Sequence, residues 1–453
     1  MVPPAASLVD LPNSVRLLLF EGIAKNVDKS LKALSLVSHS MRRTVAPILY
    51  KKIRLTEFTK ERLVALAQSS ELFRNAARFV YVHINDLHDV SSDKYSGLFA
   101  FIASLKFVSE LQYTDSPHRP ARSFLRTQQL LLAINQGCPQ LSQLGISFSR
   151  SGLYSAEKQV ERPCDAEEAR QATVIDIKNI QELNVEWTLD DAPFVDTSEA
   201  QLNSLISCSS LRELEVKTHW GDGAQPDFQL LKNAGALEVL KIKSAGPSLD
   251  IYAVIADAAP GIRRLEVDLR YNSDWQLPVA ILPFTSDPNY QLFGRFQNLR
   301  QLKLSLDLEE ASGDPLDDDH DFAWYLRCLK RRRTATQDLA RICPQLEECY
   351  WIVWPKDSEG NAMEHRFKIV AQSGSERNPE NRDDARPIEL EVWGDRLVQT
   401  YLDWWMEPHH SDEWGEDLPP DTILHPLDLD NGFLGYRLSI VDHHHTLKKK
   451  YML

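Results

Sequence analysis

The feature that most constrains the fold is a short apolar phrase that returns seven times along the chain. A clear copy reads LRELEV at residues 211–216. The central residues of the seven copies are Leu144, Leu183, Leu214, Leu240, Leu265, Leu302 and Cys349. Because apolar and polar residues alternate within each copy, the phrase predicts a strand with one buried face.

Helical stripes precede most of these strands, for example Leu202, Leu205 and Ile206 before the copy at residues 211–216. The central residues 144, 183, 214, 240, 265, 302 and 349 are separated by 39, 31, 26, 25, 37 and 47 residues. The shortest intervals match a leucine-rich repeat of about 20 to 29 residues, and the longer ones imply insertions. A helix and a strand repeated in this way predict an irregular leucine-rich-repeat-like α/β solenoid over residues 60–355.

The alternation also predicts which charges face away from the core. Leu214 and Val216 should point inward, so their polar neighbours should lie on the open face of the sheet. By this rule the candidate substrate-binding residues are Glu213, Glu215, Lys217, Lys241, Lys243, Glu266, Asp268 and Lys303. A merely solvated sheet surface explains the same charges, and the sequence leaves both interpretations open.

Other segments of the body carry weaker patterns. Residues 60–73 and 98–107 predict helices, and residues 78–84 and 111–113 predict strands. The polar stretch 149–171 predicts a long loop. The basic run 330–333 follows an acidic segment and predicts a solvated helix face, with a nuclear-import signal as the alternative.

The N-terminal residues 8–55 predict a separate bundle of about three short helices. Leu11-Pro12 suits the first turn of a helix, because the fixed φ of proline fits there and its missing N–H needs no partner. Two amphipathic stretches follow, and Pro47 is expected to break the last helix. The apolar positions of this segment are Val15, Leu18, Leu19, Leu31, Leu34, Leu36, Val37 and Met41.

This arrangement resembles an F-box, the helical module by which adaptors dock on the Skp subunit of a cullin ubiquitin ligase. The resemblance covers Leu11-Pro12, the aliphatic residues after it, the phrase LSLVS at residues 34–38 and Met41-Arg42. It implies Skp contacts at Leu11, Pro12, Val15, Leu18, Leu19, Leu34, Leu36, Val37 and Met41. A helical cap on the solenoid, without Skp binding, is the alternative.

Residues 356–453 predict a C-terminal cap. Residues 366–370 and 388–393 read as paired strands around a polar loop, and residues 395–405 as a helix with an aromatic end. Residues 401–430 are acidic and predict either an exposed arm or a strap. We favour the strap, in which Trp404 and Trp405 pack inward. Such a cover suits the open apolar edge of a terminal repeat.

Charge and cysteine usage narrow the class of protein further. The formal net charge is −14, although residues 1–60 carry ten Lys/Arg against four Asp/Glu. An acidic body argues against nucleic acid, and a basic N-terminal module fits an acidic protein partner. The six cysteines are scattered, without a Cys-x-x-Cys pair, so buried reduced thiols are expected. No secretory leader or membrane-spanning run is recognisable, which predicts a cytoplasmic or nuclear protein.

The sequence contains no recognisable catalytic motif. It contains no nucleophile elbow, zinc-protease helix, phosphate-binding loop or Rossmann fingerprint. The histidines at 443–445 lack a fixed third ligand, so no metal and no cofactor is expected. The resemblance and the repeats together imply a non-catalytic substrate-recognition adaptor of a Skp–cullin–F-box ligase. A leucine-rich-repeat scaffold without ligase recruitment is the alternative, and an enzyme is a distant third.

Overall fold

The computed structural model describes Leu36 and residues 39–56, 59–85, 95–116, 120–149, 163–188, 195–218, 226–244, 250–268, 288–305, 322–353, 363–369 and 388–391. The chain divides into two compact units, residues 1–241 and 242–453. This division falls inside the predicted solenoid. Both units are α/β, with strands and helices in alternation, as the sequence predicts.

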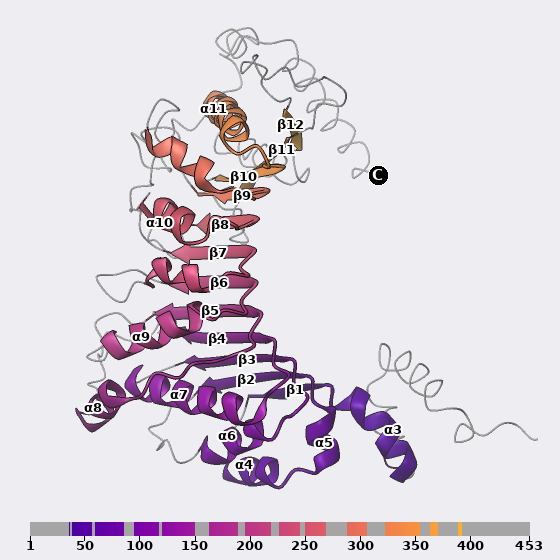
Figure 1. The fold of residues 1–453 in the computed structure, drawn as a ribbon. Coiled ribbons are helices and arrows are strands. Elements are labelled where there is room, and N and C mark those ends of the chain that lie inside the picture. Colours follow the sequence, from indigo (N-terminus) through magenta and orange to yellow (C-terminus); the bar gives the residue numbers. More distant parts are fainter. Residues whose placement is uncertain are drawn as a thin grey trace, which may run out of the picture. The chain divides into compact units, whose positions relative to one another are not determined.

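The first unit is a parallel sheet with helices on one face (Figure 1). Its strands are β1 (Lys52–Leu55), β2 (Phe79–Asn85), β3 (Glu110–Ser116), β4 (Gln143–Ser149), β5 (Glu182–Thr188) and β6 (Glu213–Thr218), and β7 (Val239–Ser244) begins at its end. Its helices are α3 (His39–Leu49), α4 (Lys60–Ala67), α5 (Glu71–Ala76), α6 (Ser96–Ala103), α7 (Pro120–Gly137), α8 (Pro163–Gln171), α9 (Val195–Ile206) and the 3-10 helix η3 (Phe228–Asn233). Each strand from β1 to β6 pairs with the next one along the chain, so every helical connection is a crossover between parallel neighbours.

The register of these strands confirms the repeat. The central residues Leu144, Leu183 and Leu214 lie opposite one another in β4, β5 and β6, and all three are buried. The same row of paired residues, which we call the buried column, continues toward the N-terminus through Leu111 in β3 and Val80 in β2 to Ile53 in β1. The repeat therefore begins three strands earlier than the apolar phrase shows.

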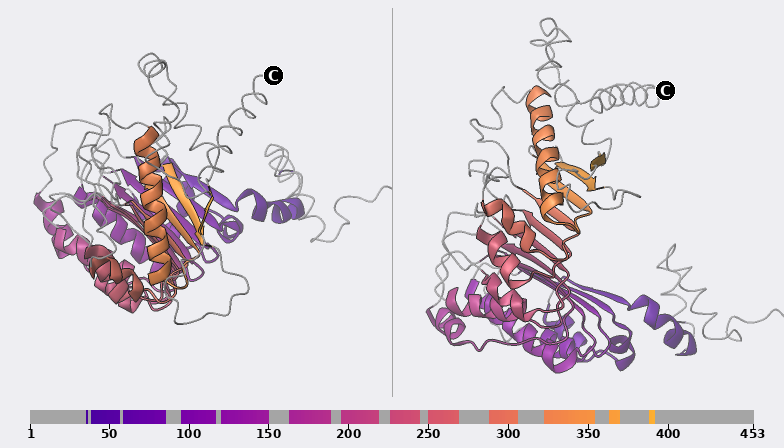
Figure 2. Two further views of the ribbon diagram at one scale, coloured as in Figure 1. Left: turned by 90° about the horizontal axis from the view of Figure 1, so that it is seen from above. Right: turned by 45° about the horizontal axis from the view of Figure 1, so that its top comes forward.

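The second unit combines parallel and antiparallel strands, with helices packed beside them (Figure 2). Its strands are β8 (Arg264–Asp268), β9 (Gln301–Leu304), β10 (Glu348–Val353), β11 (Met363–Ile369) and β12 (Ile388–Glu391). Its helices are α10 (Asp250–Ala258), η4 (Pro288–Arg295) and α11 (Phe322–Ile342). Strands β8, β9 and β10 are parallel, whereas β11 and β12 form the predicted C-terminal pair and are antiparallel. Phe367 of β11 lies opposite Cys349 and is fully buried, so this pair extends the sheet.

The end of the N-terminal module differs from the prediction. Helix α3 continues through Pro47 to Leu49, and the Tyr50 amide donates to the Ala46 carbonyl at 2.9 Å. Burial of Val45 and Ala46 offsets the backbone hydrogen bond that proline lacks. Residues 52–55 form strand β1, and they are not part of a helical bundle. Residues 8–35 and the predicted helix and acidic strap of residues 395–430 lie outside the described residues.

Three predictions for the body are also wrong. The predicted helix 60–73 is two helices, because the Ser70 hydroxyl caps α5 by accepting from the Phe73 amide at 3.3 Å. Helix α8 starts at Pro163, inside the predicted long loop, where proline suits a first turn. Arg332 is only 1% exposed, so the prediction of a solvated helix face is wrong for this residue of the basic run in α11.

Gly137 ends α7 at a close approach between two backbones. A Cβ atom added at this position would overlap the carbonyl oxygen of Ala103, which is fixed at the end of α6. We expect Gly137→Ala to lower the free energy of unfolding of the first unit by about 1–3 kcal/mol, as overpacking does elsewhere. Urea denaturation measures this effect. The control is Gly235→Ala, since a Cβ there meets nothing within 4 Å, and equal midpoints for the two variants would contradict the prediction.

Candidate protein-binding surface

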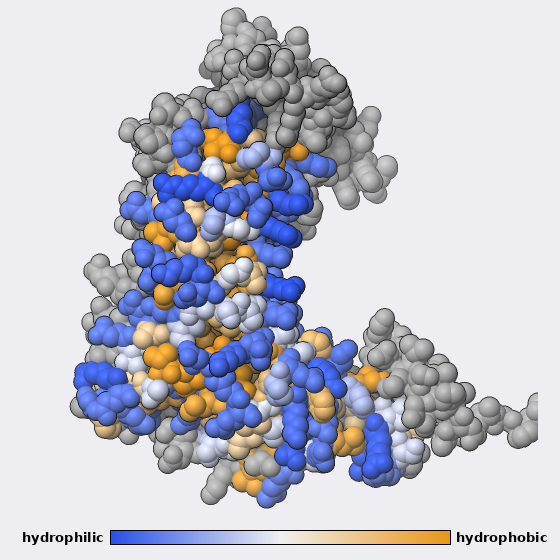
Figure 3. Space-filling model, viewed as in Figure 1, coloured by the Kyte–Doolittle hydropathy of each residue, from blue (hydrophilic) through white to orange (hydrophobic). Residues whose placement is uncertain are grey.

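In each unit, the candidate surface is the face of the strands that the helices leave uncovered. In β6 the half-buried residues Glu213, Glu215 and Lys217 alternate with fully buried ones. Strands β8 and β9 alternate in the same way around Glu266 and Lys303. The period-two assignment of these residues to the open face is therefore confirmed. Figure 3 is viewed from the side on which helices such as α7 and α9 lie in front of the strands, and it shows hydrophilic side chains with hydrophobic patches between them.

The predicted residues of the first unit pair with one another. The Lys241 ammonium lies 2.6 Å from a carboxylate oxygen of Glu213, and the Lys217 ammonium lies 3.4 Å from Glu215. Ser147 of β4 donates to Glu186 of β5 at 3.0 Å on the same face. The two ion pairs partly neutralise the charge of the open face in this unit, so only part of that charge is available to a ligand.

A cluster on β1 and β2 was missed by the sequence analysis. It consists of Lys51, Lys52 and Arg54 together with the rings of Phe79 and Tyr81, and we call it the cationic strip. The ammonium nitrogens of Lys51 and Lys52 lie 5.8 and 5.7 Å from the centre of the Phe79 ring. The Arg54 guanidinium carbon lies 5.2 Å from the centre of the Tyr81 ring. Alternation in the sequence KIRL at residues 52–55 is the signal that points to this strand, but the F-box-like interpretation places the segment in the helical module.

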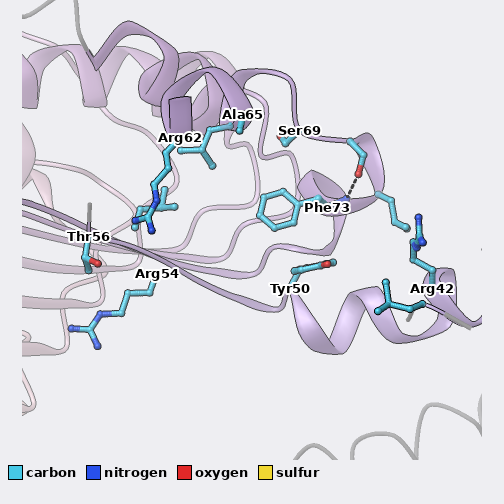
Figure 4. A pocket seen from close by; sticks show the side chains of 13 residues that line it. Arg42, Tyr50, Arg54, Thr56, Arg62, Ala65, Ser69 and Phe73 are labelled. Carbon is cyan, nitrogen blue, oxygen red and sulfur yellow. Dashed lines mark hydrogen bonds between the residues drawn. The ribbon is translucent and has the colours of Figure 1, made fainter. Parts of the chain in front are cut away.

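A groove of about 870 Å³ adjoins the cationic strip. Its walls come from α3, β1, α4 and α5, and Figure 4 shows Arg42, Arg54 and Arg62 around it with Tyr50 and Phe73. The Tyr50 and Phe73 rings meet edge to face, with centroids 4.9 Å apart. The groove thus combines three guanidinium groups with an aromatic wall, and none of its lining residues is acidic.

Two residues of the proposed Skp contact lie in the described part of the chain. Leu36 is 76% exposed and lines the groove, whereas Met41 is 4% exposed. Leu36 can therefore meet a partner directly, while Met41 supports the buried side of α3. The Skp contacts at Leu11, Pro12, Val15, Leu18, Leu19, Leu34 and Val37 lie outside the described residues and stay predictions.

The remaining predicted residues belong to the second unit. Glu266 lies opposite Lys303 in the register, and Lys303 lies opposite Tyr350. Glu348 accepts hydrogen bonds from Tyr350 and Arg366, both at 2.6 Å. Burial would raise the pKa of Glu348, but these two hydrogen bonds and the Arg366 charge lower it on balance. Lys243 and Asp268 are half-buried at the ends of β7 and β8. The structure therefore divides the predicted residues into two sets, one in each unit.

The cysteines only partly match the prediction of buried thiols. Cys138, Cys343 and Cys349 are buried, but Cys164 is exposed and Cys208 is half-buried. All five are free. Burial raises the pKa of each of the three buried thiols to about 12, so these thiols stay protonated and poorly nucleophilic at neutral pH.

We expect a thiol reagent such as DTNB at pH 8 to modify Cys164 fastest among these five residues. The three buried cysteines should react only as the chain opens, because they combine a raised pKa with burial. Mass spectrometry of the labelled peptides identifies the order of reaction, and labelling in urea is the control. Rapid labelling of Cys138 in the folded protein would contradict the described packing of α7.

The part of the chain that the structure describes contains neither a cluster of metal ligands nor a membrane-spanning helix. No three or more His, Cys, Asp or Glu residues gather there in a way that could hold a metal ion. Among the described helices none is both long and apolar enough to cross a membrane. A comparison with protein-family models finds no match, and neither does a comparison with curated proteins.

Proposed function

We propose that this chain is a substrate-recognition adaptor of a Skp–cullin–F-box ubiquitin ligase. The helices that begin at Leu11 dock on Skp, and the open face of the sheet holds a protein substrate. A separately recruited conjugating enzyme then meets the substrate at high effective concentration. The adaptor needs no reactive group of its own.

The observation that carries this proposal is the repeated strand with a charged open face, joined to the F-box-like segment. Six parallel strands present one uncovered surface in the first unit, and stacked repeats are well suited to binding other proteins over such surfaces. Helix α3 leads directly into β1, with only Tyr50 and Lys51 between them. A docking module at this end is therefore tied closely to the binding sheet.

The second candidate is a repeat scaffold that binds a protein without recruiting a ligase. Burial of Met41, Val45 and Ala46 favours it, because these side chains make α3 part of the packed structure. In that case the N-terminal helices cap the sheet. The two candidates share the binding face and differ only in whether Skp is captured.

Co-precipitation with Skp separates the two candidates. We expect the intact chain to capture Skp, and the double variant Leu11→Ala/Pro12→Ala to lose capture while its melting temperature stays nearly unchanged. The matched control is Leu132→Ala, which truncates a leucine that is 47% exposed on α7. Failure of the intact chain to capture Skp leaves the scaffold as the function. Parallel loss of capture and heat stability would show that Leu11 and Pro12 belong to the core.

A further inference from the structure

We propose that the cationic strip binds an extended acidic segment of a partner protein. The inference rests on the proposed role of the open face in protein binding, but it does not depend on Skp docking. The strip and the adjoining groove together select carboxylates that are accompanied by an apolar side chain.

The register places the cations and the rings side by side. Lys52 lies opposite Phe79 and Arg54 lies opposite Tyr81 in the parallel pair of β1 and β2. Side chains at these positions leave the same face of the sheet, because residues two apart in a strand share a face. Lys51, Lys52 and Arg54 are exposed, and the two rings are half-buried. The positive charges are therefore accessible while the rings beneath them are anchored.

Contact with the rings prepares the cations for binding. Lysine and arginine on a surface normally lose rotamer freedom when a ligand pairs with them, which weakens binding. Here Lys51, Lys52 and Arg54 already lie within 6 Å of an aromatic centre, a geometry that is itself attractive. These side chains therefore lose less rotamer freedom when they bind a carboxylate.

The region around the cationic strip is basic, whereas the chain as a whole is acidic. Residues 39–85 contain nine Lys/Arg and three Asp/Glu, a difference of +6, although the whole chain carries −14. Arg54 belongs both to the strip and to the groove, where Phe73 and Leu66 supply apolar wall. An acidic segment bound to the strip can therefore place one apolar side chain in the groove while one of its carboxylates stays paired with Arg54.

A protein segment fits this surface better than a nucleic acid does. Single strands bind by stacking bases on free aromatic faces, but cations occupy positions over both Phe79 and Tyr81. Further along the same row of the sheet lie Glu110, Glu182 and Glu213. These carboxylates repel a phosphate backbone that extends beyond the strip, whereas a short acidic peptide need not reach them.

The test is fluorescence polarisation with a labelled peptide of alternating Glu and Ser that contains a single Leu. We expect the full chain to bind it more tightly than a matched peptide with Gln in place of Glu, and less tightly as salt rises. Lys52→Gln/Arg54→Gln should weaken binding about tenfold, since each exposed pair contributes up to about fivefold. Lys106→Gln/Lys178→Gln removes the same charge from exposed sites elsewhere in the unit and should change the affinity less than about twofold.

A second variant tests whether the aromatic rings contribute to binding by positioning the cations. Phe79→Leu/Tyr81→Leu keeps every cation but removes the rings, and we expect an intermediate loss of about threefold. Thermal melts check that all variants remain folded, and Skp capture by Lys52→Gln/Arg54→Gln should equal that of the unchanged chain. Failure of this inference is thus distinct from failure of the proposed ligase function.

Three results would overturn the inference. The first is equal affinity for the Glu and Gln peptides. The second is tighter binding of a single-stranded oligouridine probe, which would make the strip a nucleic-acid site. The third is salt-dependent self-association that disappears in Lys52→Gln/Arg54→Gln, which would make a second copy of the chain the occupant of the strip.

Discussion

Replacing Arg126 by methionine is expected to lower the free energy of unfolding of the first unit by about 3–5 kcal/mol. The Arg126 side chain donates to both carboxylate oxygens of Asp115, from Nε at 2.8 Å and from Nη2 at 3.0 Å. Arg126 is 4% exposed and Asp115 is 1% exposed. The variant therefore leaves a buried carboxylate without its cation, which costs far more than the loss of a surface pair.

The surroundings of the Arg126–Asp115 pair keep the Arg126 guanidinium protonated. Burial lowers the pKa of Arg126, but the Asp115 carboxylate raises it more, so the guanidinium remains charged. Tyr113 also donates to Asp115, at 3.1 Å. Burial and the Asp115 charge raise the pKa of Tyr113 well above its usual value. Because this pKa is raised in the folded state, the contribution of Tyr113 is complete below about pH 10 and is lost as the pH rises further.

Urea denaturation of matched variants measures the effect of the buried pair. Arg170→Met is the control, since Arg170 and Glu167 pair on the surface with side chains 50% and 53% exposed. It should change stability by less than about 1 kcal/mol. The double variant Asp115→Leu/Arg126→Met should recover part of the loss, because no unpaired charge remains. A loss for Arg126→Met no larger than that for Arg170→Met would contradict the buried pair.

Truncation of Trp351 to alanine is expected to lower the stability of the second unit by about 3–5 kcal/mol. The Trp351 side chain is fully buried in β10, and its indole nitrogen donates to the Thr336 hydroxyl of α11 at 2.9 Å. Thr336 in turn donates to the Arg332 carbonyl at 2.7 Å. The ring therefore joins the strand to its covering helix by both packing and hydrogen bonding.

A graded series tests this role of the tryptophan. Trp351→Phe retains most of the apolar volume but loses the indole donor, and we expect it to fall between the unchanged chain and Trp351→Ala. The buried Cys349 thiol two residues earlier provides a second readout. Its labelling rate should rise most in Trp351→Ala, because opening of the second unit becomes more frequent. Equal midpoints for all three proteins would show that β10 does not pack on α11.

The sequence predicts much of the architecture because the relevant signals are local. The buried positions Leu214, Leu265 and Leu302 alternate with polar residues, and this alternation alone assigns each side chain to a face. The pairing of residues 366–369 with 388–391 follows from similar alternation. The sequence also predicts strands at residues 78–84 and 111–113, where β2 and β3 lie, but not at residues 52–55, which form β1. Ile53 and Val80 occupy the same buried column as the leucines, yet only the pairing of β1 with β2 reveals it.

The candidate site was predictable to a smaller extent. The period-two rule assigns Glu213 and Lys241 to one face, but their contact at 2.6 Å depends on the lateral pairing of strands. The cationic strip depends on register in the same way, because Arg54 and Tyr81 are far apart in sequence and adjacent in the sheet. Contacts between strands depend on which residues are paired, and this pairing cannot be predicted from the sequence of either strand by itself.

The sequence by itself determined that this chain forms repeated strands with one apolar and one charged face, since periodic burial needs only neighbouring residues. The tertiary structure decided where the repeat begins, which charges neutralise one another and which cations lie on aromatic rings. It also decided that Gly137 must lack a side chain and that Arg126 is buried against Asp115. These outcomes depend on distances between segments, and such distances exist only once the strands are paired and the helices are packed on them.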